Sequence, residues 1–157
     1  MSVCMLTGHR RLPSDGGELR CRLDAYIDVL CRRGVTEFLS GGALGFDLLG
    51  AEAVLYAQRA HPQVTLTMVL PCRNQSHRYS AAQRLRYEGI LARAQKVDWL
   101  SDVYYDGCML VRNRIMAERA DLCLCYLTQP RGGTAHAVAA AAARGLPIFN
   151  LADPTKE

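Results

Sequence analysis

Two glycine-rich turns, each placed between a short apolar run and a helix-like segment, constrain this chain more than any other feature. The first spans residues 40–47, Ser-Gly-Gly-Ala-Leu-Gly-Phe-Asp, and the second spans residues 130–134, Pro-Arg-Gly-Gly-Thr. Glycine lets a ligand approach the main chain closely. A helix that begins at such a turn presents unpaired N–H groups and the positive end of its dipole, which favour phosphate. A third polar turn at residues 7–10, Thr-Gly-His-Arg, follows the first apolar run. Together the three turns predict a phosphate-bearing ligand at the rim of a parallel sheet.

Apolar runs and helical patterns alternate along the whole chain. Strand-like runs lie at residues 3–6, 36–40, 64–70, 97–100, 122–127 and 148–151. Helical patterns lie at residues 16–33, 46–60, 80–95, 108–119 and 135–143, and residues 73–78 read as a polar loop. Asp15 with Glu18, and Ser80 with Gln83, have the spacing of capping pairs. Such alternation predicts a single α/β domain over residues 1–157, with a mostly parallel sheet of five to seven strands and helices on both faces.

Composition narrows the class of protein. Half of the 157 residues are hydrophobic, 22% are charged and the net charge is +4, which suits a globular protein with an anionic ligand. No apolar run approaches the roughly 20 residues of a transmembrane helix, and no signal-peptide pattern opens the chain. Seven cysteines without a Cys-x-x-Cys pair argue against disulfides and against a metal site. We therefore expect a cytoplasmic protein with no membrane partner and no metal.

The motifs resemble those of the YpsA-like branch of the SLOG superfamily, a Rossmann-like group that also holds the LOG phosphoribohydrolases and DprA. The resemblance rests on the three turns, on Leu70-Pro71-Cys72 with Gln75, and on Arg112-Asn113 with Met116. It implies a cleft for a nucleotide-derived ligand such as ADP-ribose, NAD or a nucleoside monophosphate. The residues expected to bind this ligand are Thr7, Gly8, His9, Arg10, Ser40, Gly41, Gly42, Gly45, Asp47, Cys72, Gln75, Tyr105, Arg112, Asn113, Gly132, Gly133 and Thr134.

Each of these residues also has a structural interpretation. The glycines would serve tight turns and close helix–sheet packing even without a ligand. Asp47 lies in the first turn of a helix, where a carboxylate complements the dipole. Arg10 could equally be a solvated surface side chain. His9 could form a structural hydrogen bond to a loop carbonyl. Either Tyr104 or Tyr105 could stack on a base, or cover the core.

Three functions stay open. The first is a binding module that senses or sequesters a small phosphate-bearing ligand. The second is a nucleotide N-glycosidase, for which Asp47, Glu52 and His136 are the catalytic candidates. It is disfavoured because Ala137 occupies the position where the LOG hydrolases carry a glutamate. The third is a DprA-like protein that binds single-stranded DNA, although the arginines are scattered along several helices. The sequence is also compatible with a homo-oligomer.

Overall fold

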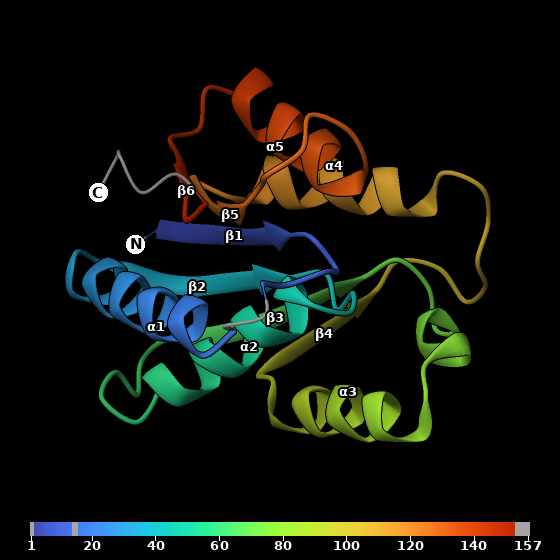
Figure 1. The fold of residues 1–157 in the computed structure, drawn as a ribbon, viewed down its shortest axis with the longest axis horizontal. Helices are drawn as coiled ribbons and strands as arrows, with labels where there is room; N and C mark the ends of the chain where they lie inside the picture. The colour runs from blue at the N-terminus through green and yellow to red at the C-terminus, as the bar shows by residue number, and fades with distance from the viewer. Residues whose placement is uncertain (1, 14–15, 153–157) are drawn as a thin grey trace.

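The computed structural model describes residues 2–13 and 16–152 and contains one six-stranded sheet with helices on both faces (Figure 1). In chain order the elements are β1 (Ser2–Gly8), α1 (Gly16–Arg32), β2 (Val35–Ser40), α2 (Phe46–Ala57), β3 (Thr65–Leu70), the 3-10 helix η1 (Gln75–Arg78), α3 (Ala81–Arg93), β4 (Lys96–Trp99), α4 (Cys108–Arg119), β5 (Leu122–Tyr126), α5 (Gly133–Ala143) and β6 (Ile148–Asn150). The predicted α/β class is confirmed.

All strand pairings are parallel, and the strand order is β4-β3-β2-β1-β5-β6. From the central strand β1, the chain winds outward through β2, β3 and β4, and then returns to build β5 and β6 on the other side. The direction of winding therefore changes between β1 and β5. In open parallel sheets, ligands bind outside the carboxyl ends of the strands at this change of direction.

Successive residues of the central strands enter two different hydrophobic cores. Cys4 and Leu6 of β1 belong to the core beneath α1 and α2, while Met5 belongs to the core beneath α4 and α5. Leu124 and Cys125 of β5 divide in the same way. Because side chains alternate across a strand, a strand buried on both faces is a continuous apolar run. This explains why the apolar runs of the sequence located the sheet correctly.

Several predictions were wrong in detail. Helix α3 ends at Arg93 rather than near residue 95, and α5 begins at Gly133 rather than at residue 135. The segment predicted as a polar loop at residues 73–78 contains η1. Helix α2 ends at Ala57 rather than near residue 60, because the chain turns there and the Gln58 side chain donates to the carbonyl of Val64 (3.1 Å). By contrast, the capping box of Ser80 and Gln83 at the start of α3 is confirmed. The predicted pair of Asp15 and Glu18 lies partly outside the described residues.

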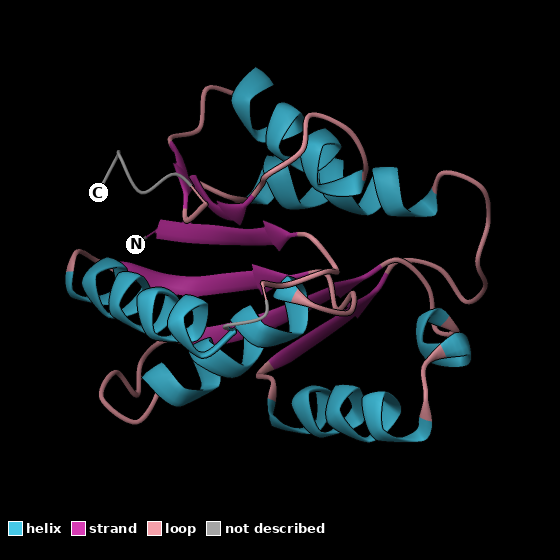
Figure 2. Cartoon of the chain, viewed as in Figure 1, coloured by secondary structure: helices cyan, strands magenta, loops and turns pink. Residues whose placement is uncertain are grey.

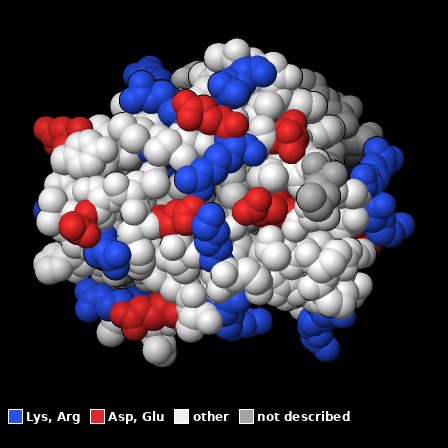
Figure 3. All heavy atoms as spheres, turned by 180° about the vertical axis from the view of Figure 1, so that it is seen from behind, with Lys and Arg blue, Asp and Glu red and all other residues white. Residues whose placement is uncertain are grey.

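At the arrowhead ends of the strands, the β4–α4 loop extends well beyond the sheet (Figure 2). On the face turned away in this view, Lys and Arg side chains lie interspersed with Asp and Glu (Figure 3). Within residues 2–13 and 16–152, no helix combines the length and the apolar character that crossing a membrane requires.

Candidate functional site

The three polar turns meet at one edge of the sheet. They follow β1, β2 and β5, which are neighbours in the strand order. Between them lies a cavity of about 260 Å³, here called the inner chamber. Its walls come from the turn after β1, the first glycine turn, α4 and the start of α5: Thr7, Gly8, His9, Arg10, Ala43, Asp47, Met109, Arg112, Asn113, Gly133 and Thr134. The topology thus brings most of the predicted ligand-binding residues together.

A larger cavity of about 630 Å³, here called the outer chamber, adjoins the first. It includes Cys72 and Gln75 among the predicted residues, and Arg10 and Met109 line both chambers. Its other walls are Leu44, Asn74, His77, Arg78, Tyr79 and Tyr104. Of the predicted residues, Ser40, Gly41, Gly42, Gly45, Tyr105 and Gly132 line neither chamber.

Three backbone N–H groups of the first glycine turn have hydrogen-bond acceptors within the protein. The N–H of Ala43 donates to Oδ2 of Asp47 (3.2 Å), and the N–H of Gly42 reaches Oγ of Ser40 (3.4 Å). The N–H of Phe46, at the start of α2, donates to the carbonyl of His9 (3.1 Å). These three donors are therefore directed into the protein, where they are not offered to a phosphate.

Glycine is required in this turn for packing. Gly45 has φ 82°, and a Cβ at this position would collide with the backbone of Arg10. At Gly41, a Cβ would collide with the guanidinium of Arg112. The structural interpretation of these two glycines is therefore sufficient to explain them. The glycines of the turn hold it against Arg10 and Arg112 at the sheet edge, so they shape the chamber without lining it, while Ala43 and Asp47 of the same turn form part of its wall.

Asp47 places a carboxylate in the inner chamber. Only 5% of the surface of Asp47 is exposed. Burial raises the pKa of Asp47 to about 6, although the charge of Arg112 and the N–H groups of Ala43 and Gly8 act in the opposite direction. Asp47 therefore ionises within the physiological range, where a small change of environment alters its charge.

Arg112 supplies the opposite charge from α4. The residue is 6% exposed, and burial lowers the pKa of its guanidinium while Asp47 raises it. Its nitrogens donate to neutral acceptors: Nη1 to the carbonyl of Gly41 (2.7 Å) and Nε to Oδ1 of Asn113 (2.9 Å), with Nη2 3.8 Å from the sulfur of Met109. Among the described residues, no carboxylate forms an ion pair with it. A buried cation that makes its hydrogen bonds to neutral groups at a cavity wall is suited to an anionic ligand, and the nearby Asp47 carboxyl balances part of its charge when ionised.

The second glycine turn, unlike the first, is open. Gly132 has φ 98° and begins α5 without a side-chain cap, and nothing lies within 4 Å of a Cβ built at Gly132 or Gly133. Nδ2 of Asn113 donates to the carbonyl of Gly133 (3.2 Å), which fixes the turn against α4. The first N–H groups of a helix have no intrahelical acceptor, so the start of α5 offers donors to the inner chamber.

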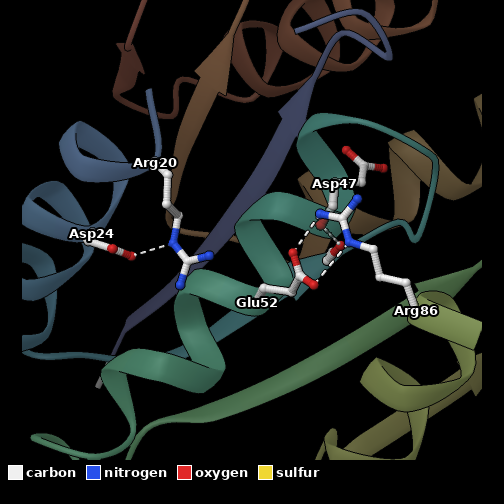
Figure 4. A network of polar contacts seen from close by, with 6 residues as sticks. Arg20, Asp24, Asp47, Glu52 and Arg86 are labelled. Carbon is white, nitrogen blue, oxygen red and sulfur yellow. Dashed lines mark hydrogen bonds and ion pairs between the residues drawn. The ribbon is translucent and has the colours of Figure 1, made fainter. Parts of the chain in front are cut away.

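Two of the three catalytic candidates lie away from the inner chamber. Glu52 forms an ion pair with Arg86 of α3, with Oε1 2.5 Å from Nη2 (Figure 4). His136 lines a groove between α4 and α5, where its Nδ1 lies 3.4 Å from Nδ2 of Asn113. Asp47 alone of the three faces the cavity. His9, in turn, accepts the N–H of Thr128 at Nε2 (2.9 Å), so it serves a structural role in the loop, although with an N–H as its partner instead of the predicted carbonyl.

Cys72 is buried at the end of β3, and burial raises the pKa of its thiol. It lines the outer chamber, and a raised pKa disfavours the thiolate form that acts as a nucleophile. All seven cysteines are free. Among the described residues, no group of His, Cys, Asp and Glu side chains has an arrangement that could hold a metal ion.

Sequence reasoning missed several wall residues. Met109 precedes Arg112 by three positions on α4, so helical spacing alone could have placed it on the same face. Tyr79 follows η1 and donates its hydroxyl to the carbonyl of Gly42 (3.1 Å), across 37 residues. No local pattern signals such a contact. Of the tyrosine pair in the β4–α4 loop, Tyr104 lines the outer chamber and Tyr105 does not.

Solved structures with a similar fold include two DNA-processing proteins. DprA of Helicobacter pylori, whose structure describes a single-stranded DNA binding mode, aligns with a TM-score of 0.67 at 20% identity, over 95% of this chain and 64% of that one. DprA of Streptococcus pneumoniae aligns with a TM-score of 0.66 at 17% identity, over 95% of this chain and 50% of that one. At these identities the likeness establishes the fold alone.

Sequence comparison is more specific. A UPF0398 protein of Halalkalibacterium halodurans is 30% identical over 110 residues, which are 69% of this chain and 58% of the relative. The chain therefore matches little more than half the length of this relative. A family model described as the YspA SLOG family matches residues 18–145, which include both glycine-rich turns and α4. The chain thus belongs to the YpsA family of SLOG proteins.

Proposed function

We propose that the chain is a binding module for a phosphate-bearing, nucleotide-derived ligand, with the phosphate in the inner chamber. The observation that carries this proposal is the buried guanidinium of Arg112, whose hydrogen bonds go to neutral groups. The open start of α5 and the side chain of Arg10 add donors around the same cavity. A phosphate there would receive charge-assisted hydrogen bonds, which are about twice as strong as neutral ones.

The proposal is tested by thermal-shift measurements with ADP-ribose, NAD and AMP, followed by calorimetry on any ligand that stabilises the protein. A ligand at 100 times its dissociation constant stabilises the folded state by about 2.7 kcal/mol. For a chain of this length the midpoint should rise by about 5–10 °C. Nucleoside without phosphate is the control and should give no shift. If no phosphate-bearing compound changes the midpoint while the protein is folded, the proposal fails.

A second candidate is nucleotide N-glycosidase activity, favoured by the pKa of Asp47, which burial raises to about 6. A carboxylate that exchanges a proton near neutral pH is suited to general acid–base catalysis. Against it, Ala137 is buried in the core beneath α4 and α5, so α5 adds no carboxylate at the hydrolase position. Chromatography of AMP incubated with the protein decides between the two: release of adenine that is abolished in Asp47→Asn establishes the enzyme.

Binding of single-stranded DNA is the third candidate, suggested by the fold shared with DprA. The face in Figure 3 gives no support to it, because basic and acidic side chains lie interspersed there instead of forming a basic stripe. Proteins that bind single strands combine a basic groove with aromatic platforms. An oligonucleotide in the same thermal-shift series tests this alternative, and a shift that disappears between about 50 and 200 mM salt would indicate phosphate contacts along a strand.

A further inference from the structure

The inner chamber is small for a site that would hold a whole nucleotide. Its volume of about 260 Å³ lies below the range of roughly 300–1,000 Å³ that is usual for small-molecule sites. The outer chamber, at about 630 Å³, lies well within that range. Arg10 and Met109 form part of both walls, so the two spaces adjoin at these two side chains. A ligand whose phosphate occupies the inner chamber therefore extends into the outer one.

The outer chamber presents an aromatic ring that the fold does not use for its core. Tyr104 is 56% exposed although its side chain is large and partly apolar. It lies on the β4–α4 loop and is absent from both hydrophobic cores. Exposed aromatic side chains at the wall of a cavity are typical of ligand platforms, because every base offers a π-face for stacking.

The backbone that carries Tyr104 is held in place. Its N–H donates to Oδ1 of Asn74 (3.0 Å), in the loop before η1. Two further contacts join the same segments: the N–H of Arg73 donates to the carbonyl of Ser101 (3.1 Å), and Nε of Arg73 lies 3.1 Å from Oδ1 of Asp102. The ring is thus displayed from a positioned loop, which reduces the entropy lost when a ligand stacks on it.

The side chains around the Tyr104 ring are suited to a nucleotide, because they include both cations and amides. Arg10 and Arg78 both line the outer chamber, and Asn74 and Gln75 bring side-chain amides to its wall. Oε1 of Gln75 accepts the hydroxyl of Tyr87 (3.2 Å), and its Nε2 donates to the carbonyl of Gly41 (3.0 Å), which fixes the amide. We infer that the outer chamber is a base-binding subsite in which Tyr104 stacks on the base of the nucleotide whose phosphate lies in the inner chamber. This inference rests on the proposed function.

Calorimetry with AMP and ribose 5-phosphate tests the inference, because the two probes share a sugar and a phosphate and differ by the base. The wild-type protein should bind AMP more tightly, by roughly 5- to 150-fold, the range for stacking one base on an aromatic side chain. In Tyr104→Ala this preference should fall toward equality while the affinity for ribose 5-phosphate is unchanged. Tyr104→Phe keeps the ring and should keep the preference.

Tyr105→Ala is the matched control, since Tyr105 is the adjacent tyrosine, is 45% exposed and lines neither chamber. It should bind both probes as the wild type does. Equal affinity of the wild type for AMP and ribose 5-phosphate would overturn the base subsite and leave the phosphate site standing. Loss of the preference in Tyr105→Ala as well as in Tyr104→Ala would also overturn it, because a disturbed loop would then explain both. Binding of neither probe, together with no thermal shift from ADP-ribose or NAD, would refute the proposed function itself.

Discussion

Arg10 is exposed and lines both chambers. Its substitution therefore measures directly how much one cation of the cleft contributes to ligand binding. We expect Arg10→Ala to weaken the binding of ADP-ribose by about 1.5–3 kcal/mol, the range for hydrogen bonds to charged groups. Isothermal calorimetry measures the change. Arg11→Ala removes an equal charge from an exposed neighbour outside both chambers and should leave the affinity intact. Equal losses in the two variants would show that only net charge matters.

Asp47 couples stability to pH. The pKa of this carboxyl rises from 3.8 in an unfolded chain to about 6 in the folded protein, chiefly through burial. A raised folded-state pKa means that the folded protein binds the proton more tightly, so its stability falls as pH rises from about 4 to about 6. About two pKa units correspond to roughly 3 kcal/mol. Relative to Asp47→Asn, the wild type should therefore lose about 3 kcal/mol between about pH 4 and pH 7.

Urea unfolding of both proteins across this range measures the difference. The charged and titratable groups that face Asp47 are Arg112, Arg10 and Tyr79, and burial raises the pKa of Tyr79 to about 12, far above this range. The comparison with Asp47→Asn isolates the contribution of the carboxyl. The side-chain amide introduced by Asp47→Asn would retain an oxygen acceptor for the N–H of Ala43, which makes the substitution a conservative comparison. Parallel pH profiles for the two proteins would contradict the assignment.

At the scale of the elements, two glycines should respond to alanine in opposite directions. Gly45 begins α2 at φ 82° and touches the backbone of Arg10, so Gly45→Ala should destabilise the protein by roughly 1–3 kcal/mol. Gly89 lies inside α3, is exposed and has nothing within 4 Å of a built Cβ, so Gly89→Ala should stabilise it by about 0.5–1 kcal/mol. Thermal unfolding compares the variants, and a stable Gly45→Ala protein would show that the turn can rearrange.

The elements that sequence predicted well are those with a local cause. The strands appear as continuous apolar runs because both faces are covered, and α3 begins at Ser80 because its side chain and that of Gln83 cap the helix. The site depends on contacts between distant segments. Arg112 reaches the carbonyl of Gly41 across 71 residues, and no local pattern encodes that approach. The satisfaction of the first glycine turn by Asp47 likewise depends on how the turn folds back upon α2.

For the whole molecule, the two hydrophobic cores share one sheet, so we propose that residues 1–157 unfold as a single cooperative unit. Trp99, the sole tryptophan, lies on the edge strand β4 and packs against the core beneath α1 and α2. Its fluorescence reports that edge, while far-ultraviolet circular dichroism reports all the helices. The two urea transitions should coincide, as two-state unfolding requires. Separate midpoints would divide the chain into independently stable parts.

The position of Asp47 has a consequence for reading related chains. A glycine pattern alone does not reveal whether the N–H groups of such a turn are free to bind a ligand. Here the N–H of Ala43 donates to the carboxylate of Asp47, which belongs to the helix that follows the turn. The residue two positions after the last glycine of the turn is therefore the diagnostic one. An aspartate there indicates a turn in which a carboxylate of the protein itself accepts a backbone N–H. A small neutral residue there would leave the N–H of Ala43 without this acceptor, free to bind an anion from solution.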